Sequence, residues 1–341
     1  MSDASKYRMP AEWERHASTW LAWPHRTSDW PGKFGPIRPV YGEIIRTLSR
    51  YEFVNIVVAD TAMQARATKL LNDVDADLAN VKFQVASTNR SWVRDSGAIF
   101  VKDGKKNVAL DWHFNAWAKY PDWPLDDALP EQMAQWTKTK RVQPKFGKQR
   151  IVLEGGSIDV DGTGRMLTTE ECLLSKIQER NPPMNRADYE AVFQQYLGIN
   201  EVIWLNKGIA GDDTHGHVDD LARFVSSDTV VTVVEQNEAD ENFEPLMENL
   251  ARLKAVKGLN VVPLPMPAPL YMQSTRLPAS YANFYIADAV VIVPTFNDPA
   301  DRIALGILAE VFPTRTVVGI HCVDLVWGLG TLHCMTQQEP A

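Results

Sequence analysis

The stretch Val290–Ile320, VVIVPTFNDPADRIALGILAEVFPTRTVVGI, contains the pattern that decides the fold class. It opens with one β-branched run, Val290–Val293, and closes with another, Thr316–Ile320. Between them, Asp298 followed by a proline is a typical helix start, because a capping carboxylate precedes a residue suited to the first turn. The expected buried face of this helix consists of Ile303, Ile307, Leu308 and Val311. The stretch therefore predicts a strand, a helix and a second strand.

Similar patterns extend over the rest of the chain. The other predicted strands are Phe53–Val58, Val81–Val85, Val108–Asp111, Ile151–Leu153, Val202–Trp204 and Val230–Val234. The other predicted helices are Arg38–Tyr51, Met184–Leu197 and Glu241–Val256. No linker or charge block interrupts this alternation, so we expect a flexible N-terminus over residues 1–8 and one α/β catalytic domain over residues 9–341. No fixed-period sequence repeat is detectable, so self-similarity alone does not predict a repeat architecture.

Composition and charge exclude several classes of protein. The 341 residues are 45% hydrophobic, which is ample for a large core and unlike a disordered chain. The formal charge of −8 does not suit nucleic-acid binding, which requires clustered Lys and Arg, whereas it suits small cationic ligands. No apolar stretch is long enough to span a membrane, and the first residues are polar where a signal peptide is apolar. The three cysteines, Cys172, Cys322 and Cys334, indicate reduced thiols, and we expect a cytoplasmic protein.

Two clusters place a carboxylate beside glycines after strand-like runs, where loops on a rigid scaffold often carry function. In Asn89–Gly97, NRSWVRDSG, an Arg-Asp pair precedes a glycine, and the alternative reading is a plain surface ion pair. In Leu153–Ser157, LEGGS, Glu154 lies between a strand-like run and two glycines, whose missing side chains leave the carboxylate free to face a cleft. The alternative for the second cluster is a bulge or a hairpin turn.

A third cluster, Gly211–Asp220 with the sequence GDDTHGHVDD, holds two of the seven histidines among four carboxylates. His217 beside a carboxylate would be a tunable proton shuttle, and Asp219 would grip a cation. The alternative is a metal-dependent hydrolase that uses His215, His217 and Asp219, since that spacing is common among metal ligands. The remaining histidines form no second ligand-like cluster, and we expect no metal and no cofactor.

The fourth cluster, Trp327–Gln338 with the sequence WGLGTLHCMTQQ, contains Cys334. A lone buried cysteine is usually inert packing. Here a glycine-rich approach and a polar continuation are unlike a core segment. A thiol of ordinary pKa is only a few per cent ionised at neutral pH, and a nearby cation would increase the reactive thiolate fraction.

Together the four clusters suit the hydrolysis of a guanidinium group, which is planar, always charged and poorly electrophilic. Asp95 and Asp219 can clamp its N–H edges, and Cys334 can attack its carbon. His217 can protonate the departing ammonia and later activate water, while Glu154 orients the imidazole. This chemistry requires no cofactor.

At this point the sequence resembles the agmatine deiminase family, also called bacterial peptidylarginine-deiminase-like proteins. The resemblance rests on Met9–Glu14 (MPAEWE), Trp20–Pro24 (WLAWP) and the four clusters, in the family's order from about residue 9 to residue 340. It implies a five-bladed α/β propeller, the pentein fold, with the site in a central channel. It also implies a covalent thiouronium intermediate on Cys334, a possible homodimer, and a place in putrescine biosynthesis. By motif, the resemblance assigns Cys334, His217, Glu154, Asp95 and Asp219 the roles given above.

Two departures from the family pattern concern the substrate tail. The first cluster reads Asn-Arg-Ser-Trp, with Arg90 in second place, where the family usually has Asn-Asp before the tryptophan. The last reads Gly-Leu-Gly-Thr-Leu-His-Cys where a third glycine and an asparagine are more typical. Agmatine ends in an ammonium group, for which a carboxylate or an aromatic cage is suitable. Asp29, Trp92 and Trp112 are the candidates for binding the tail. We expect agmatine as the substrate. The alternatives are another small guanidine, free arginine and peptidylarginine. For free arginine, the sequence offers no identifiable arginine to bind its carboxylate.

Overall fold

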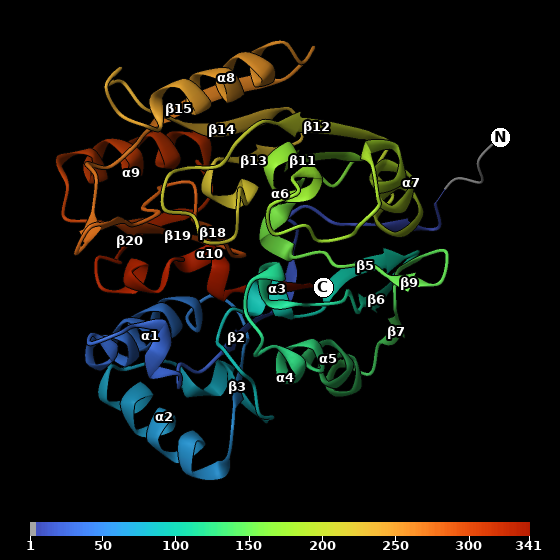
Figure 1. The fold of residues 1–341 in the computed structure, drawn as a ribbon. Coiled ribbons are helices and arrows are strands. Elements are labelled where there is room, and N and C mark those ends of the chain that lie inside the picture. The colour runs from blue at the N-terminus through green and yellow to red at the C-terminus, as the bar shows by residue number, and fades with distance from the viewer. Residues whose placement is uncertain (1–4) are drawn as a thin grey trace.

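The computed structural model describes residues 5–341. Its repeating unit is a pair of antiparallel strands, an outer helix, and a third strand that runs parallel to the second. This unit occurs five times, and Figure 1 shows the five sheets arranged around a common centre with their helices on the outside. The structure thus confirms the α/β class and the five-bladed propeller that the resemblance implied.

The unit predicted from Val290–Ile320 is one of the five blades. Strand β18 (Tyr285–Ile286) is antiparallel to β19 (Val290–Thr295), helix α9 (Pro299–Val311) follows, and β20 (Thr316–His321) returns parallel to β19. Asp298 caps α9 by accepting a hydrogen bond from the backbone of Ala300, and Asp301 completes a reciprocal capping box. The predicted helix start is therefore confirmed.

Three further blades have the same order. They consist of β5 (Ile99–Asp103), β6 (Lys106–Leu110), α5 (Leu129–Thr137) and β7 (Lys140–Val142); of β10 (Asp159–Val160), β11 (Arg165–Thr169), α7 (Arg186–Leu197) and β12 (Glu201–Leu205); and of β13 (Ala222–Ser226), β14 (Thr229–Val234), α8 (Phe243–Lys254) and β15 (Asn260–Pro265). In each, the helix connects two parallel strands, which a short hairpin could not do.

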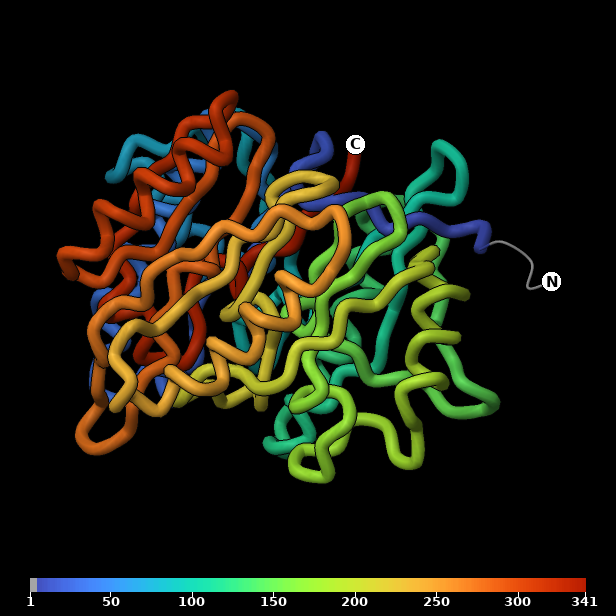
Figure 2. The backbone as a smooth tube through the Cα atoms, turned by 90° about the horizontal axis from the view of Figure 1, so that it is seen from above, coloured from blue at the N-terminus to red at the C-terminus, as the bar shows by residue number. Residues whose placement is uncertain are grey.

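The remaining blade joins the two ends of the chain. Strand β2 (His16–Ala22) is followed by α1 (Phe34–Leu48), β3 (Val54–Val58), α2 (Thr61–Asp73) and β4 (Val81–Val85). The antiparallel partner of β2 is β21 (Gln337–Pro340), which lies only a few residues after Cys334. In Figure 2 the red C-terminal end accordingly lies beside the blue N-terminal segment. This closure anchors the segment that carries the thiol.

Shorter elements complete the fold and place loops at its centre. The remaining strands are β1 (Tyr7–Arg8), β8 (Lys145–Phe146), β9 (Gln149–Arg150), β16 (Tyr271–Met272) and β17 (Thr275–Arg276). The remaining α-helices are α3 (Val93–Ser96), α4 (Pro124–Asp127), α6 (Glu170–Leu174) and α10 (Leu332–Met335). Helices α3 and α10 contact each other near the centre of the propeller in Figure 1.

Three expectations require correction. Residues 1–4 lie outside the described part of the chain, but Tyr7 and Arg8, expected to be flexible, form β1 and pair with β5. Ile151–Leu153 is buried but forms only a single bridge, between Val152 and His113, since an extended core segment need not join a sheet. Ile303 is 54% exposed, because α9 turns Ala304 and Leu308 toward the sheet instead.

Hydrophobic packing follows this architecture. The largest core cluster includes residues of β3, β14 and β19, together with the inner faces of α1, α8 and α9. Burial of this apolar area is the main stabilising contribution, at about 25 cal/mol per Å² removed from water. Within residues 5–341, no helix is both long and apolar enough to cross a membrane.

Candidate active site

The five residues singled out for catalysis come from four separate segments and meet at the centre of the propeller. Asp95 lies on α3, Glu154 precedes a 3₁₀ turn at Gly155–Ser157, His217 precedes another at Val218–Asp220 that contains Asp219, and Cys334 lies on α10. All five are at least 95% buried. These short turns expose backbone and side chains toward the interior, which long helices and strands would not do.

His217 is surrounded by carboxylates at distances that leave room for a ligand. Its Nδ1 lies 3.8 Å from Asp95 Oδ1 and 4.0 Å from Asp219 Oδ1, and its Nε2 lies 3.9 Å from Glu154 Oε2. Both ring nitrogens, Glu154 Oε2 and Asp219 Oδ1 are buried without a hydrogen-bond partner among the described residues. Buried polar atoms normally have partners, so these four mark positions for ligand or water atoms.

The same carboxylates determine the charge of the ring. Burial opposes a charge on His217, but the carboxylate of Asp95, the Cys172 thiol and the carboxylate of Asp219 outweigh it and raise the pKa of His217 well above its usual value. Glu154 is oriented from behind by Arg180, whose Nε donates to Glu154 Oε1 over 2.9 Å. Its second oxygen, Oε2, is the one on the side of His217. The imidazolium is thus available as a proton donor.

Asp219 is held by a chain of buried polar groups. Its Oδ2 lies 2.7 Å from His333 Nδ1, and His333 Nε2 lies 2.8 Å from Glu12 Oε2. Burial alone would raise the pKa of Asp219, but the hydrogen bond from His333 lowers it below its usual value. Glu12 in turn accepts from Arg223 and Arg94. Asp219 is therefore kept anionic and fixed in position.

The surroundings of Asp95 favour its ionised form less than those of Asp219 do. Its Oδ2 accepts from Trp117 Nε1 over 2.9 Å, and its Oδ1 accepts from the backbone N–H of Gly156 over 3.0 Å. Burial, together with the neighbouring carboxylates of Asp219 and Glu154, raises the pKa of Asp95 to about 6. A bound cation would favour its ionised form.

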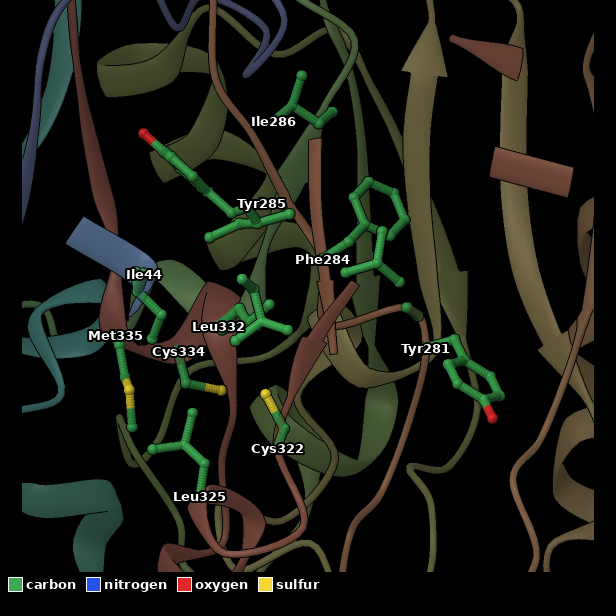
Figure 3. Packing of buried hydrophobic residues seen from close by; sticks show 14 of the residues in the cluster. Ile44, Tyr281, Phe284, Tyr285, Ile286, Cys322, Leu325, Leu332, Cys334 and Met335 are labelled. Atoms are coloured by element: carbon green, nitrogen blue, oxygen red, sulfur yellow. The ribbon is translucent and has the colours of Figure 1, made fainter. Parts of the chain in front are cut away.

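Cys334 borders a cavity with a volume of about 120 Å³. Its Sγ lies 3.7 Å from Asp219 Oδ2, and Figure 3 shows the residue among Leu325, Leu332 and Met335. Burial and the carboxylates of Asp219, Asp220 and Asp95 raise the pKa of the Cys334 thiol well above its usual value. A positive ligand between these carboxylates and the sulfur would reverse much of this effect.

The absence of a side chain at Gly156 makes the cluster possible. A Cβ atom at this position would lie 2.5 Å from His217 Nδ1, 2.9 Å from Asp95 Oδ1 and 3.0 Å from Asp219 Oδ2. These distances are too short for any side chain. The second glycine of the predicted Glu-Gly-Gly motif therefore lets the imidazole of His217 and the carboxylates of Asp95 and Asp219 approach one another.

The same cavity extends to the residues considered for the substrate tail. Trp92 and Asp29 line it, together with Trp117, Tyr120 and Trp327. Asp29 is ion-paired with Arg90 over 2.5 Å, and Arg90 itself lines the cavity. An arginine thus borders the pocket, although none was identifiable from the sequence.

Trp112 is placed differently from our expectation. It is not among the residues that line the cavity, and its ring packs edge-on against Tyr196 in a core cluster. Its position after β6 directs it to the interior of a blade. Trp117, five residues later, reaches the cavity instead, because residues 116–118 adopt positive φ angles that turn the chain inward.

Several functional contacts were not predicted. Glu12 and His333 lie within motifs that carried the resemblance, yet no role was assigned to them. Arg180 and Tyr120 lie in segments without any recognised motif. Only His333 could have been found from the sequence, because it directly precedes Cys334 and shares the backbone turn that positions the thiol.

The metal alternative requires three side chains, of which His217 and Asp219 lie close together while His215 points elsewhere. His215 has a positive φ angle, and its Nε2 lies 3.0 Å from Ser175 Oγ. In the part of the chain that the structure describes, the group of potential metal ligands around His217 consists of Glu154, Cys172 and His217, and His215 is not part of it. The buried guanidinium of Arg180 beside Glu154 is unfavourable for a second cation there.

The fold and the site together define a C–N hydrolase that acts on guanidinium groups. The family model for Porphyromonas-type peptidyl-arginine deiminase matches residues 8–340, and the chain belongs to the agmatine deiminase family. It is 34% identical to an agmatine deiminase of Pseudomonas aeruginosa, with 99% of this chain and 96% of the relative covered. The corresponding values for an agmatine deiminase of Medicago truncatula are 36%, 98% and 96%.

A solved structure of an agmatine deiminase also matches this chain. A Cys-to-Ser variant of agmatine deiminase from C. jejuni, with substrate bound, has a TM-score of 0.89 and is 31% identical, with 98% of this chain and 96% of that chain covered. The fold and the family are therefore shown over almost the whole chain.

Proposed function

We propose that the protein deiminates agmatine to N-carbamoylputrescine and ammonia through a covalent thiouronium intermediate on Cys334. The observation that carries this proposal is the convergence of Cys334 Sγ, the His217 ring and the carboxylates of Asp95 and Asp219 at the centre of the propeller. The buried carboxylate oxygens without partners at this position, Glu154 Oε2 and Asp219 Oδ1, match a planar cation with several N–H donors.

In the first step, Asp95 and Asp219 accept hydrogen bonds from the guanidinium N–H groups and fix its plane. The positive charge next to Cys334 favours the thiolate, which attacks the guanidinium carbon. The carbon becomes tetrahedral, the C–N bond breaks, and His217 protonates the leaving nitrogen, which departs as ammonia. The product of this step is an S-alkylthiouronium group on Cys334.

In the second step, water replaces the sulfur. His217, now neutral, removes a proton from a water molecule, and the resulting hydroxide attacks the thiouronium carbon. The C–S bond breaks, the thiolate is regenerated, the hydroxyl proton is lost to solvent, and the neutral ureido product leaves. Glu154 acts on both steps by orienting the ring of His217. The net reaction consumes one guanidine and one water, and it requires no cofactor.

Agmatine is the first choice of substrate because the similar proteins carry that name and the cavity holds aromatic side chains suited to an aliphatic chain. Another small guanidine is the alternative, since Arg90 changes the charge around Asp29. Peptidylarginine is a third candidate, because the matching family model is named for that substrate.

The test is ammonia release from agmatine, free arginine and a blocked arginine peptide, with Cys334→Ser as the control. We expect turnover of agmatine, no turnover by Cys334→Ser, and no effect of a chelator. If only the peptide were turned over, peptidylarginine would replace agmatine as the proposed substrate. Activity that survives Cys334→Ser but is lost to a chelator would refute the cysteine mechanism in favour of metal-dependent hydrolysis.

A further inference from the structure

Asn283 lies directly behind the thiol, and none of the sequence motifs drew attention to it. It precedes β18 and is completely buried. Its Nδ2 donates a hydrogen bond to Cys334 Sγ over 3.1 Å and another to Asp220 Oδ1 over 3.0 Å. Both amide hydrogens are thus in use, one of them on the proposed nucleophile.

The orientation of this amide is fixed by its other end. Asn283 Oδ1 accepts from Thr331 Oγ1 over 2.7 Å, from the backbone N–H of His333 over 3.0 Å and more weakly from that of Cys334 over 3.4 Å. Exchanging the oxygen and nitrogen would direct the amide hydrogens at these donors and the oxygen at Asp220. The surrounding hydrogen bonds therefore require that the N–H group faces the sulfur.

The electrostatic surroundings of the sulfur make a side-chain donor important, although the backbone N–H of Thr331 also favours the ionised thiol. The titratable side chains that act on the sulfur are acidic, namely Asp219, whose Oδ2 lies at 3.7 Å, Asp220 and Asp95. In the site as described, Asn283 provides the side-chain N–H directed at Sγ. A hydrogen bond to the ionised form of a group favours that form, and the effect is larger in a buried site.

We propose that Asn283 is a further catalytic residue, whose amide N–H stabilises negative charge on the sulfur of Cys334 when the thiolate forms and again when it departs from the thiouronium. This inference rests on the proposed role of Cys334 as the nucleophile. It adds a donor that is present before substrate binds, whereas the substrate cation acts only when bound.

The competing interpretation is that Asn283 only holds the turn at residues 331–334 in place. Two substitutions separate the roles. Asn283→Asp keeps an oxygen for the donors of the turn but loses the N–H group, and Asn283→Ser loses it without adding a charge. Thr331→Val is the matched control, because it removes one bond to Asn283 Oδ1 and leaves Nδ2 facing the sulfur.

The measurement is the rate at which iodoacetamide alkylates Cys334 as a function of pH in the substrate-free protein, with the site located by peptide mapping. We expect the alkylation profile of Asn283→Ser and Asn283→Asp to move up by about one pH unit or more. We also expect kcat to fall about tenfold or more, whereas Thr331→Val lowers the Tm and keeps the wild-type profile. If Asn283→Asp does not fold, Asn283→Ser alone tests the inference.

Two outcomes would overturn the inference. One is a wild-type alkylation profile and kcat in a folded Asn283 variant. The other is an equal shift in Thr331→Val, which would assign Asn283 to holding the turn. Alkylation requires no turnover, so a failure of this inference is distinguishable from a failure of the proposed function, which would appear as absence of ammonia release by the wild type.

Discussion

Arg90 Nη1 lies 2.5 Å from Asp29 Oδ1 in the wall of the cavity that Cys334 borders. The same guanidinium lies 3.2 Å from Asp122 and stacks over the ring of Tyr120. Asp29, our candidate for binding an ammonium tail, therefore already has a cationic partner. The departure of Arg90 from the family pattern thus bears directly on the substrate tail.

We predict that Arg90→Gln improves the binding of agmatine. Removing the guanidinium leaves Asp29 with Arg26 as its nearest cation, at 3.9 Å, so an ammonium tail gains a carboxylate partner. The expected fall in the KM for agmatine is roughly fivefold, corresponding to about 1 kcal/mol. The measurement is steady-state ammonia release at pH 8 and above, because burial raises the pKa of Asp29 to about 6 with Arg90 present and loss of that guanidinium raises it further.

Two controls accompany this variant. Butylguanidine has no charged tail, so its KM should not change in Arg90→Gln. Arg46→Gln removes an arginine whose ion pair is with Glu43 on α1, and it should behave as wild type. An unchanged or higher KM for agmatine in Arg90→Gln would show that Asp29 does not bind the tail.

We predict that Gly156→Ala abolishes most activity while the protein still folds. The added methyl group would displace the His217 ring, whose Nδ1 lies 2.5 Å from the new Cβ position. A displacement of about 1 Å in a catalytic group can cost a hundredfold in rate, and we expect a loss in kcat of that order. Gly306→Ala on α9 is the matched control, because its Cβ meets no atom within 4 Å.

The Gly306→Ala variant should retain full activity and the same or a slightly higher Tm, since alanine favours a helix. A kcat for Gly156→Ala close to that of Gly306→Ala would mean that the imidazole does not need its observed position.

Guanidinium binding should weaken in acid because of Asp95. The ionised carboxylate binds the cation, and burial raises the pKa of Asp95 to about 6, so affinity is full above this pH and declines below it. At pH 5 only about 10% of such a group is ionised, which predicts roughly tenfold weaker binding than at pH 8. Calorimetry of agmatine with Cys334→Ser measures this without turnover, since the guanidinium stays charged throughout.

Asp219 should not contribute to that decline, because the hydrogen bond from His333 lowers its pKa although burial opposes this. An affinity that is constant between pH 5 and 8 would contradict the assignment of Asp95 as a clamp with a raised pKa.

Local sequence patterns predicted much of the secondary structure. The blade from β18 to β20 was predictable because its capping residues and β-branched runs are contiguous in the chain. The five-fold repeat was not detectable, since each blade forms the same backbone pattern from different residues. Only the family resemblance indicated it.

The candidate catalytic groups could be singled out for a related reason. Their motifs combine reactive side chains with glycines, such as Gly156, which leaves space for the imidazole and the two carboxylates that approach it. Their supporting contacts were not predictable from local sequence. His333 and Glu12 are 321 positions apart, and Asn283 and Cys334 are 51 apart, so these pairs depend on the closure of the propeller by β21.

The most direct test of the account is rapid quenching of the protein during agmatine turnover, followed by mass spectrometry of its peptides. We predict that the peptide containing Cys334 carries the mass of agmatine less one ammonia, and that this adduct is absent without agmatine and in Cys334→Ser. Steady ammonia release without any adduct on Cys334, or with the adduct on Cys172, would contradict the central claim that Cys334 is the nucleophile.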